Sequence, residues 1–155
     1  MITSFKTSAE SATTLPEIVC PNDTNPMGML LGGRLVQWMD VAAAICAQLH
    51  AEEICVTSFI DTMTFKASAR VGEIVTVRAK LVRAFNTSME IFVEAWSRPV
   101  KSSQSQMVSE AFFSFVAIDD KGVPCRVPAM KPQTPEEKRA FVASGKRKRT
   151  KLKSR

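Results

Sequence analysis

A single long apolar segment constrains the fold of this chain more than any other feature. Between residues 33 and 50, apolar side chains recur every three or four positions without a proline, which predicts a helix. The polar residues before its end are Arg34, Gln37, Asp40 and Gln48. A helix that is apolar around most of its surface must be buried, so the rest of the chain has to cover it.

The segments that follow this helix have the character of strands. Residues 54–65, 73–85, 88–97 and 106–118 are each rich in Val, Ile, Phe or Thr, and a first strand is predicted near residues 13–19. The second and third of the four are joined so briefly that they should form an antiparallel hairpin. We therefore predict an α+β fold in which an antiparallel sheet wraps one long central helix.

The length and charge distribution indicate one domain with tails. A chain of 155 residues suits one core, and we place the domain at residues 12–140, after an N-terminal segment of residues 1–11 and with a short peripheral helix beginning near residue 135. The net charge of +6 comes from the last ten residues, which carry seven Lys or Arg and no acid. We expect residues 141–155 to form a disordered basic tail, and a nucleic-acid partner is not expected because the remaining chain is not basic.

The composition also argues against several other classes of protein. There is no apolar run of about 18 residues and no pattern of a signal peptide, so we expect no membrane span and a cytoplasmic protein. The four cysteines form no C-x-x-C pair and are predicted to be mostly buried thiols. With a single histidine in the chain, no metal site is expected.

The stretch from Asn25 to Asp40 holds the residues most suited to chemistry. Gly32 and Gly33, at the predicted helix start, leave backbone N–H groups free to hold an anion or a developing oxyanion, although they could also serve only a tight turn. Asp40 lies inside the apolar segment without a cation three or four residues away. A buried, unpaired carboxylate is costly, so Asp40 is predicted to be either functional or a hydrogen-bonded structural residue.

Several residues of this stretch, in their spacing, resemble the signature of the hotdog-fold acyl-CoA thioesterases. These are Asn25, Gly28, Gly32, Gly33 and Asp40. That family includes bacterial YciA-like enzymes and the vertebrate brain-type cytosolic acyl-CoA hydrolases. The similarity continues through residues 56–57, 61–65, 71–73, 87–90 and 115–128, and it covers roughly residues 12–140. The ordered set is far more specific than any one fragment.

The resemblance implies a hotdog fold and hydrolysis of acyl-CoA thioesters without a metal or redox cofactor. Asp40 would be the catalytic carboxylate, as general base or as nucleophile, and a backbone N–H at Gly32 or Gly33 would stabilise the oxyanion. Asn25 would orient the thioester or the water, the alternative being a loop-capping role. It also implies a homo-oligomer, a dimer joined edge to edge and commonly a trimer of dimers, in which Asn25 of one chain faces Asp40 of another.

For the CoA portion, the resemblance points to the turn at Asn86, Thr87 and Ser88, whose hydroxyl and backbone groups would meet the pantetheine or the nucleotide. Lys66 and Arg83 would pair with phosphates, although exposed cations at strand ends more often serve only solubility.

One competing function is a non-catalytic hotdog sensor or regulator that binds acyl-CoA or fatty acid, but the presence of both Asn25 and Asp40 argues against it. Another is a dehydratase, which needs a paired histidine and carboxylate. The lone His50 is not predicted to be a general base, because it lies near the helix C-terminus, where a cation favours the helix dipole.

Overall fold

The computed structural model of the chain describes residues 5–154, so residues 1–4 of the expected N-terminal segment and residue 155 of the expected tail lie outside it. Its main elements are β1 (Thr13–Ile18), α1 (Gly32–Ala51), β2 (Ile54–Phe65), β3 (Ile74–Ala84), β4 (Ser88–Arg98), β5 (Gln106–Ile118) and α2 (Pro135–Lys153). Short 3-10 helices occupy Ser8–Glu10 and Pro21–Asp23. The central helix and the five strands lie where the sequence predicts them, to within one or two residues at each end.

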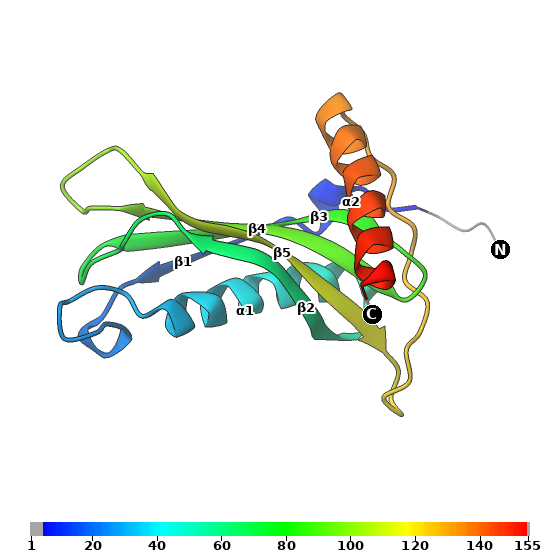
Figure 1. Cartoon of the computed structure of the whole chain (residues 1–155), viewed down its shortest axis with the longest axis horizontal. Coiled ribbons are helices and arrows are strands. Elements are labelled where there is room, and N and C mark those ends of the chain that lie inside the picture. The colour runs from blue at the N-terminus through cyan, green and yellow to red at the C-terminus, as the bar shows by residue number, and fades with distance from the viewer. Residues whose placement is uncertain (1–4, 155) are drawn as a thin grey trace.

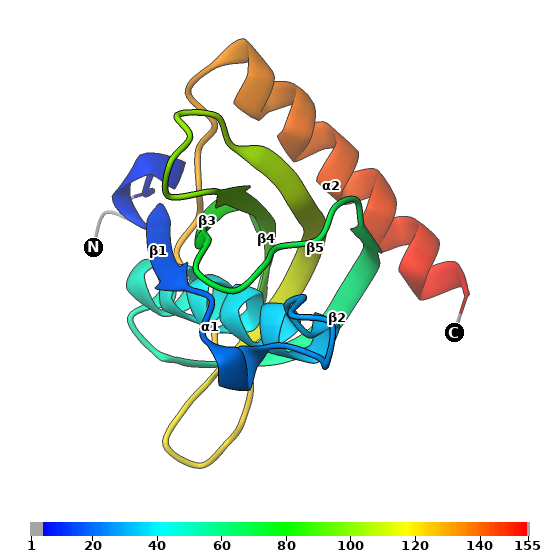
Figure 2. The same ribbon diagram turned by 90° about the vertical axis from the view of Figure 1, so that its left-hand side faces the viewer.

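The five strands form one antiparallel sheet in the order β1-β3-β4-β5-β2. The expected hairpin is confirmed, since β3 and β4 pair antiparallel. The sheet curves around α1, while α2 lies against its opposite face (Figures 1 and 2). The predicted α+β architecture, with a helix wrapped by an antiparallel sheet, is therefore confirmed.

The core lies between α1 and the concave face of the sheet. Met39, Ala43 and Cys46 of α1 are fully buried, and so are Ile91 and Phe113 of the strands opposite. Small side chains at alternate turns of α1 let the strands pack closely against it. The sequence predicts that α1 is buried on most of its surface. In the single chain, one side of the helix is instead exposed to solvent.

The strand β2 forms one edge of the sheet and exposes a row of apolar side chains. Ile54, Phe59 and Phe65 are 59%, 42% and 56% exposed. The strand is twelve residues long and bends at two irregularities in its pairing with β5. A long, apolar edge strand is a ready template for pairing with another chain.

The C-terminal region differs from the disordered basic tail and short helix predicted from the sequence. Helix α2 runs for 19 residues, and its start is fixed by a capping box between Thr134 and Glu137. Near its other end, Arg147 forms a two-pronged ion pair with the buried Glu90 of β4. Like charges oppose a helix in isolation, but here part of the cationic side chains is neutralised or stacked on the outer face of the sheet.

Candidate active site

Asp40 and Thr57 form a carboxylate–hydroxyl pair between α1 and β2. The hydroxyl of Thr57 donates a hydrogen bond to Oδ1 of Asp40 over 2.6 Å. Asp40 is half-buried, and within residues 5–154 neither a cation nor a donor to its Oδ2 atom is present. The hydrogen bond is one of the two alternatives that the sequence left open, and a functional role for Asp40 stays a prediction: one oxygen is held by the strand, and the other is available to a ligand or water.

Thr57 was not predicted as a site residue. The sequence contained a signal for it, because strand side chains alternate and Thr57 lies two positions after the buried Cys55, on the face that meets α1. The alternation of side chains along a strand does not predict how α1 is aligned along β2. It is this alignment that places the Thr57 hydroxyl opposite Asp40.

The N-terminus of α1 presents free N–H groups, as predicted. Leu31 is the N-cap residue and makes no side-chain capping bond. Gly28 has a φ of 75°, a backbone conformation of tight turns that favours glycine. Neither Gly32 nor Gly33 has a positive φ, so backbone conformation does not explain why these two positions hold glycine. A Cβ on Gly32 would lie 3.3 Å from the ring of Phe65, and a Cβ on Gly33 would face open space. Gly32 thus admits an aromatic ring, and Gly33 leaves an unobstructed helix end.

Asn25 has the loop-capping role that the sequence allowed as an alternative. Its Oδ1 accepts hydrogen bonds from the backbone N–H groups of Met27 and Met29, over 2.9 and 3.1 Å. Its Nδ2 donates to no acceptor within the described part of the chain. The carbonyl side of the amide holds the loop, and the amino side remains a donor.

One chain does not bring these groups to a single point. Asp40 follows Gly32 by eight residues of α1, which corresponds to about 12 Å along the helix axis. A thioester carbonyl held by N–H groups at the helix end is therefore out of reach of the Asp40 of the same chain.

The residues expected to bind CoA are divided between the two ends of the sheet. Ser88 pairs with Val116 of β5, whereas the N–H of Lys66 donates to the backbone oxygen of Val108, also in β5. Val108 and Val116 are eight residues apart, which is about 26 Å along that strand. Lys66 also pairs with Glu110 over 2.8 Å. Within one chain, Lys66 therefore does not join the turn at Asn86, Thr87 and Ser88.

Arg83 is not the exposed strand-end cation that the sequence suggested. Its guanidinium donates to the backbone oxygen of Phe141 over 3.0 Å and lies 4.0 Å from the centre of the Phe141 ring. Arg83 therefore anchors α2 to the sheet.

His50 is excluded as a general base for a different reason from the one predicted. The side chain is 1% exposed, and its Nε2 lies 2.7 Å from the backbone oxygen of Pro128. Burial lowers the pKa of His50, so the helix end holds a neutral imidazole rather than a cation. Burial likewise raises the pKa of Cys46 and Cys55 to about 11, which makes them poor nucleophiles, while Cys20 is exposed.

No group of three or more His, Cys, Asp or Glu side chains within residues 5–154 is arranged to hold a metal ion. Across the same range, no helix is both long enough and apolar enough to cross a bilayer.

Residues 27–103 match the model of the thioesterase superfamily. The acyl-CoA thioester hydrolase YciA of Escherichia coli is 36% identical over 117 residues, which are 74% of this chain and 89% of that protein. The chain belongs to the thioesterase superfamily. It also matches the acetyl-coenzyme A thioesterases of mouse and rat, at 37% and 36% identity, but spans only about a fifth of their length.

Solved structures of this superfamily extend the likeness to nearly the whole chain. A hexameric acyl-CoA thioesterase has a TM-score of 0.92 at 34% identity and covers 97% of both chains. The acyl-CoA hydrolase of Staphylococcus aureus, in complex with butyryl-CoA, CoA and CoA disulfide, has a TM-score of 0.87 at 30% identity and covers 97% of this chain and 94% of that one. The same enzyme has been solved with alanine in place of one aspartate, one asparagine or one threonine. The hotdog fold and the family resemblance predicted from the sequence are thus confirmed.

Proposed function

We propose that this protein hydrolyses acyl-CoA thioesters to a carboxylic acid and CoA. The observation that carries the proposal is the pair of Asp40 and Thr57, whose geometry gives a carboxylate with one oxygen fixed and one free. In the reaction the thioester carbon gains an oxygen from water, the carbon–sulfur bond breaks, and the thiolate of CoA leaves and takes up a proton. Water is the only co-reactant, so no cofactor is proposed.

The spacing of three residues supports this assignment. The asparagine and aspartate replaced in the S. aureus enzyme are fifteen residues apart, and the aspartate and threonine are seventeen apart. Asn25, Asp40 and Thr57 have the same two spacings here. Three residue types at matching intervals favour one catalytic set in both chains, with Thr57 added to the residues predicted from sequence.

Each member of the set has a defined task in the proposed mechanism. The hydroxyl of Thr57 orients Asp40, which acts through Oδ2 as general base for water or as nucleophile at the thioester carbon. The free amino group of Asn25 donates to the thioester or to the water. An N–H at Gly32 or Gly33 stabilises the oxyanion with the favourable field of the helix N-terminus.

We further propose that the complete site lies between two copies of the chain. The axial separation of about 12 Å between Gly32 and Asp40 requires a second chain to bring a helix end to the carboxylate. The apolar edge strand β2, which carries Thr57, offers the surface for edge-to-edge pairing. By likeness to the hexameric relative we propose three such dimers in a hexamer.

The test is release of free thiol from acetyl-, butyryl-, hexanoyl-, lauroyl- and palmitoyl-CoA. The native protein is compared with Asp40→Asn, after sedimentation has shown an unchanged oligomer. Loss of a catalytic acid–base group should lower kcat by about a hundredfold or more. A native protein that binds these compounds without turnover would instead be a sensor, and the proposal would fail.

A single-turnover reaction in ¹⁸O-labelled water, with enzyme in excess, tests whether Asp40 is the nucleophile. Unlabelled acid, with the label retained in the Asp40 carboxylate, requires an Asp40 anhydride that water opens at the aspartyl carbon. Label in the acid is expected both for a general base and for an anhydride opened at the acyl carbon, and rapid-quench mass spectrometry of the acylated chain then separates these two.

A further inference from the structure

The edge strand β2 contacts both of the groups that one chain keeps apart, the carboxylate of Asp40 and the start of α1. Thr57, which donates to Asp40, lies near the beginning of the strand. Phe65 is its last residue, and the ring would lie 3.3 Å from a Cβ on Gly32. Both side chains therefore lie on the inner face of the sheet, toward α1, one beside the carboxylate and one beside the helix start.

Antiparallel pairing of β2 with a second copy of itself joins these two positions. In such a pair the chains are related by a two-fold axis, so a residue before the axis lies opposite a residue equally far after it. Thr57 and Phe65 are each four residues from Asp61. The irregularities of β2 do not move this midpoint, because the partners of Thr57, Asp61 and Phe65 on β5 are evenly spaced, at positions 115, 112 and 109.

We infer that β2 pairs with β2 of a second copy about Asp61, and that the partner subunit's Phe65 thereby forms a wall of the acyl site beside Asp40. The inference rests on the proposed function. Residues directly opposite in an antiparallel pair have Cα atoms about 4.5–5.5 Å apart, so Thr57 and the partner subunit's Phe65 become neighbours. A register shifted by one residue would place an inner side chain opposite an outer one.

The position on the axis carries a charge that α2 compensates. Asp61 would lie opposite its own copy, and like charges opposite each other in a sheet are destabilising. Lys151 of α2 lies 3.9 Å from the Asp61 carboxylate and 4.6 Å from the centre of the Phe59 ring on the same strand. Each chain thus brings a cation to this part of the edge strand, which offsets the repulsion between the two carboxylates.

An apolar cavity beside the Phe65 ring has the character of an acyl-chain site. It has a volume of about 180 Å³, and Gly32 belongs to its lining, so it lies next to the N–H groups proposed to hold the oxyanion. Leu35, Ala69 and Val108 form its buried walls, and the exposed ring of Phe65 lies at its rim. An acyl group whose carbonyl is held at the helix start would place its first carbons here, which favours apolar over charged chains.

Cysteine crosslinking tests the register without catalysis. Asp61→Cys and the control Thr64→Cys are made together with Cys20→Ser, because Cys20 is exposed. Two cysteines at position 61 would have a Cα separation that a disulfide spans, about 4.4–6.8 Å. Position 64 lies two pairing steps from the axis, so its two copies would be about 13 Å apart along the strands. Asp61→Cys should give a covalent dimer on mild oxidation; its absence, or equal crosslinking of Thr64→Cys, would overturn the inference.

Chain-length selectivity tests the role of Phe65. Phe65→Leu is compared with Phe59→Leu, a control that removes a ring stacked on Lys151, away from the cavity. Loss of the ring at position 65 should lower kcat/KM for hexanoyl-CoA about tenfold relative to acetyl-CoA, because the longer chain loses more apolar contact. Phe59→Leu should leave the ratio of the two substrates unchanged. An unchanged ratio in Phe65→Leu would refute the assigned role.

Mixed dimers of Asp40→Asn and Phe65→Leu show which chain supplies the ring. The two variants are co-expressed with different tags, and dimers that carry both tags are purified. One site of such a dimer combines an intact Asp40 with the partner subunit's intact Phe65, so the native ratio of hexanoyl-CoA to acetyl-CoA turnover should return. A ratio that stays at the value of Phe65→Leu would overturn the inference. Crosslinking of Asp61→Cys in a protein that hydrolyses no thioester would overturn the proposed function and leave the register standing.

Discussion

Replacing Arg147 by methionine should destabilise the protein by about 2–3 kcal/mol. The side chain of its partner Glu90 is only 4% exposed, and Arg147 donates to both of its oxygens while lying 3.7 Å from the centre of the Phe112 ring. Removing one partner of a buried ion pair costs about 3–5 kcal/mol. We expect less than the upper end, because Lys151 remains 3.8 Å from Glu90 and the Arg147 side chain is 25% exposed.

The loss is measured by urea denaturation at a fixed protomer concentration, since an oligomer gains stability with concentration. Arg149→Met, on the exposed side of the same helix, is the matched control and should change stability by less than about 0.5 kcal/mol. Adding Glu90→Gln to Arg147→Met should recover part of the loss, because the stranded charge is then removed. If Arg147→Met costs no more than Arg149→Met, the ion pair does not hold α2 to the sheet.

Three further predictions concern the site and the central helix. Thr57→Val should lower kcat by about tenfold to a hundredfold, the value of a hydrogen bond to a charged group; an unchanged kcat would exclude its role in orienting Asp40. Gly32→Ala should give a lower melting temperature than Gly33→Ala, because the Cβ on residue 32 would lie 3.3 Å from the Phe65 ring, which must shift, whereas a Cβ on residue 33 faces open space; equal melting curves would contradict this. Since burial lowers the pKa of His50 from 6.5, the unfolded chain takes up the proton more readily. Melting temperatures should therefore fall as the pH drops below about 6.5, and less so in His50→Gln.

Periodicity was enough to predict the central helix and the sheet, because burial of a helix and alternation in strands are properties of neighbouring residues. The helix start was also found. Asp40 could be proposed as a site residue because a carboxylate within an apolar segment is visible in the sequence, and its role stays a prediction. Thr57 was missed because its hydrogen bond to Asp40 depends on how α1 is aligned along β2. Asn25 shows the limit of choosing between alternatives, as one side of its amide caps the loop and the other is free.

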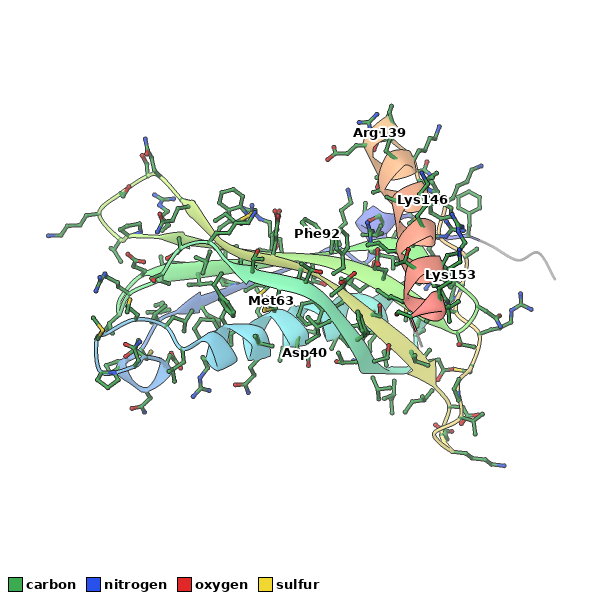
Figure 3. All side chains as sticks on the ribbon, viewed as in Figure 1. Asp40, Met63, Phe92, Arg139, Lys146 and Lys153 are labelled. Atoms are coloured by element: carbon green, nitrogen blue, oxygen red, sulfur yellow. The ribbon has the colours of Figure 1, made fainter. Side chains whose placement is uncertain are left out.

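The prediction of a disordered tail at residues 141–155 was wrong, because it rested on the number of basic residues and not on their positions around a helix. Arg147, Lys148 and Lys151 are spaced so that they share one helical face, and that face meets the sheet; Lys146, Arg149 and Lys153 share the other. Figure 3 places Lys146 and Lys153 along α2, on the opposite side of the sheet from Asp40. Half-buried cations are screened less by salt than exposed ones. The ion pair between Arg147 and Glu90 should therefore hold α2 to the sheet at salt concentrations that abolish any attraction by the outer face.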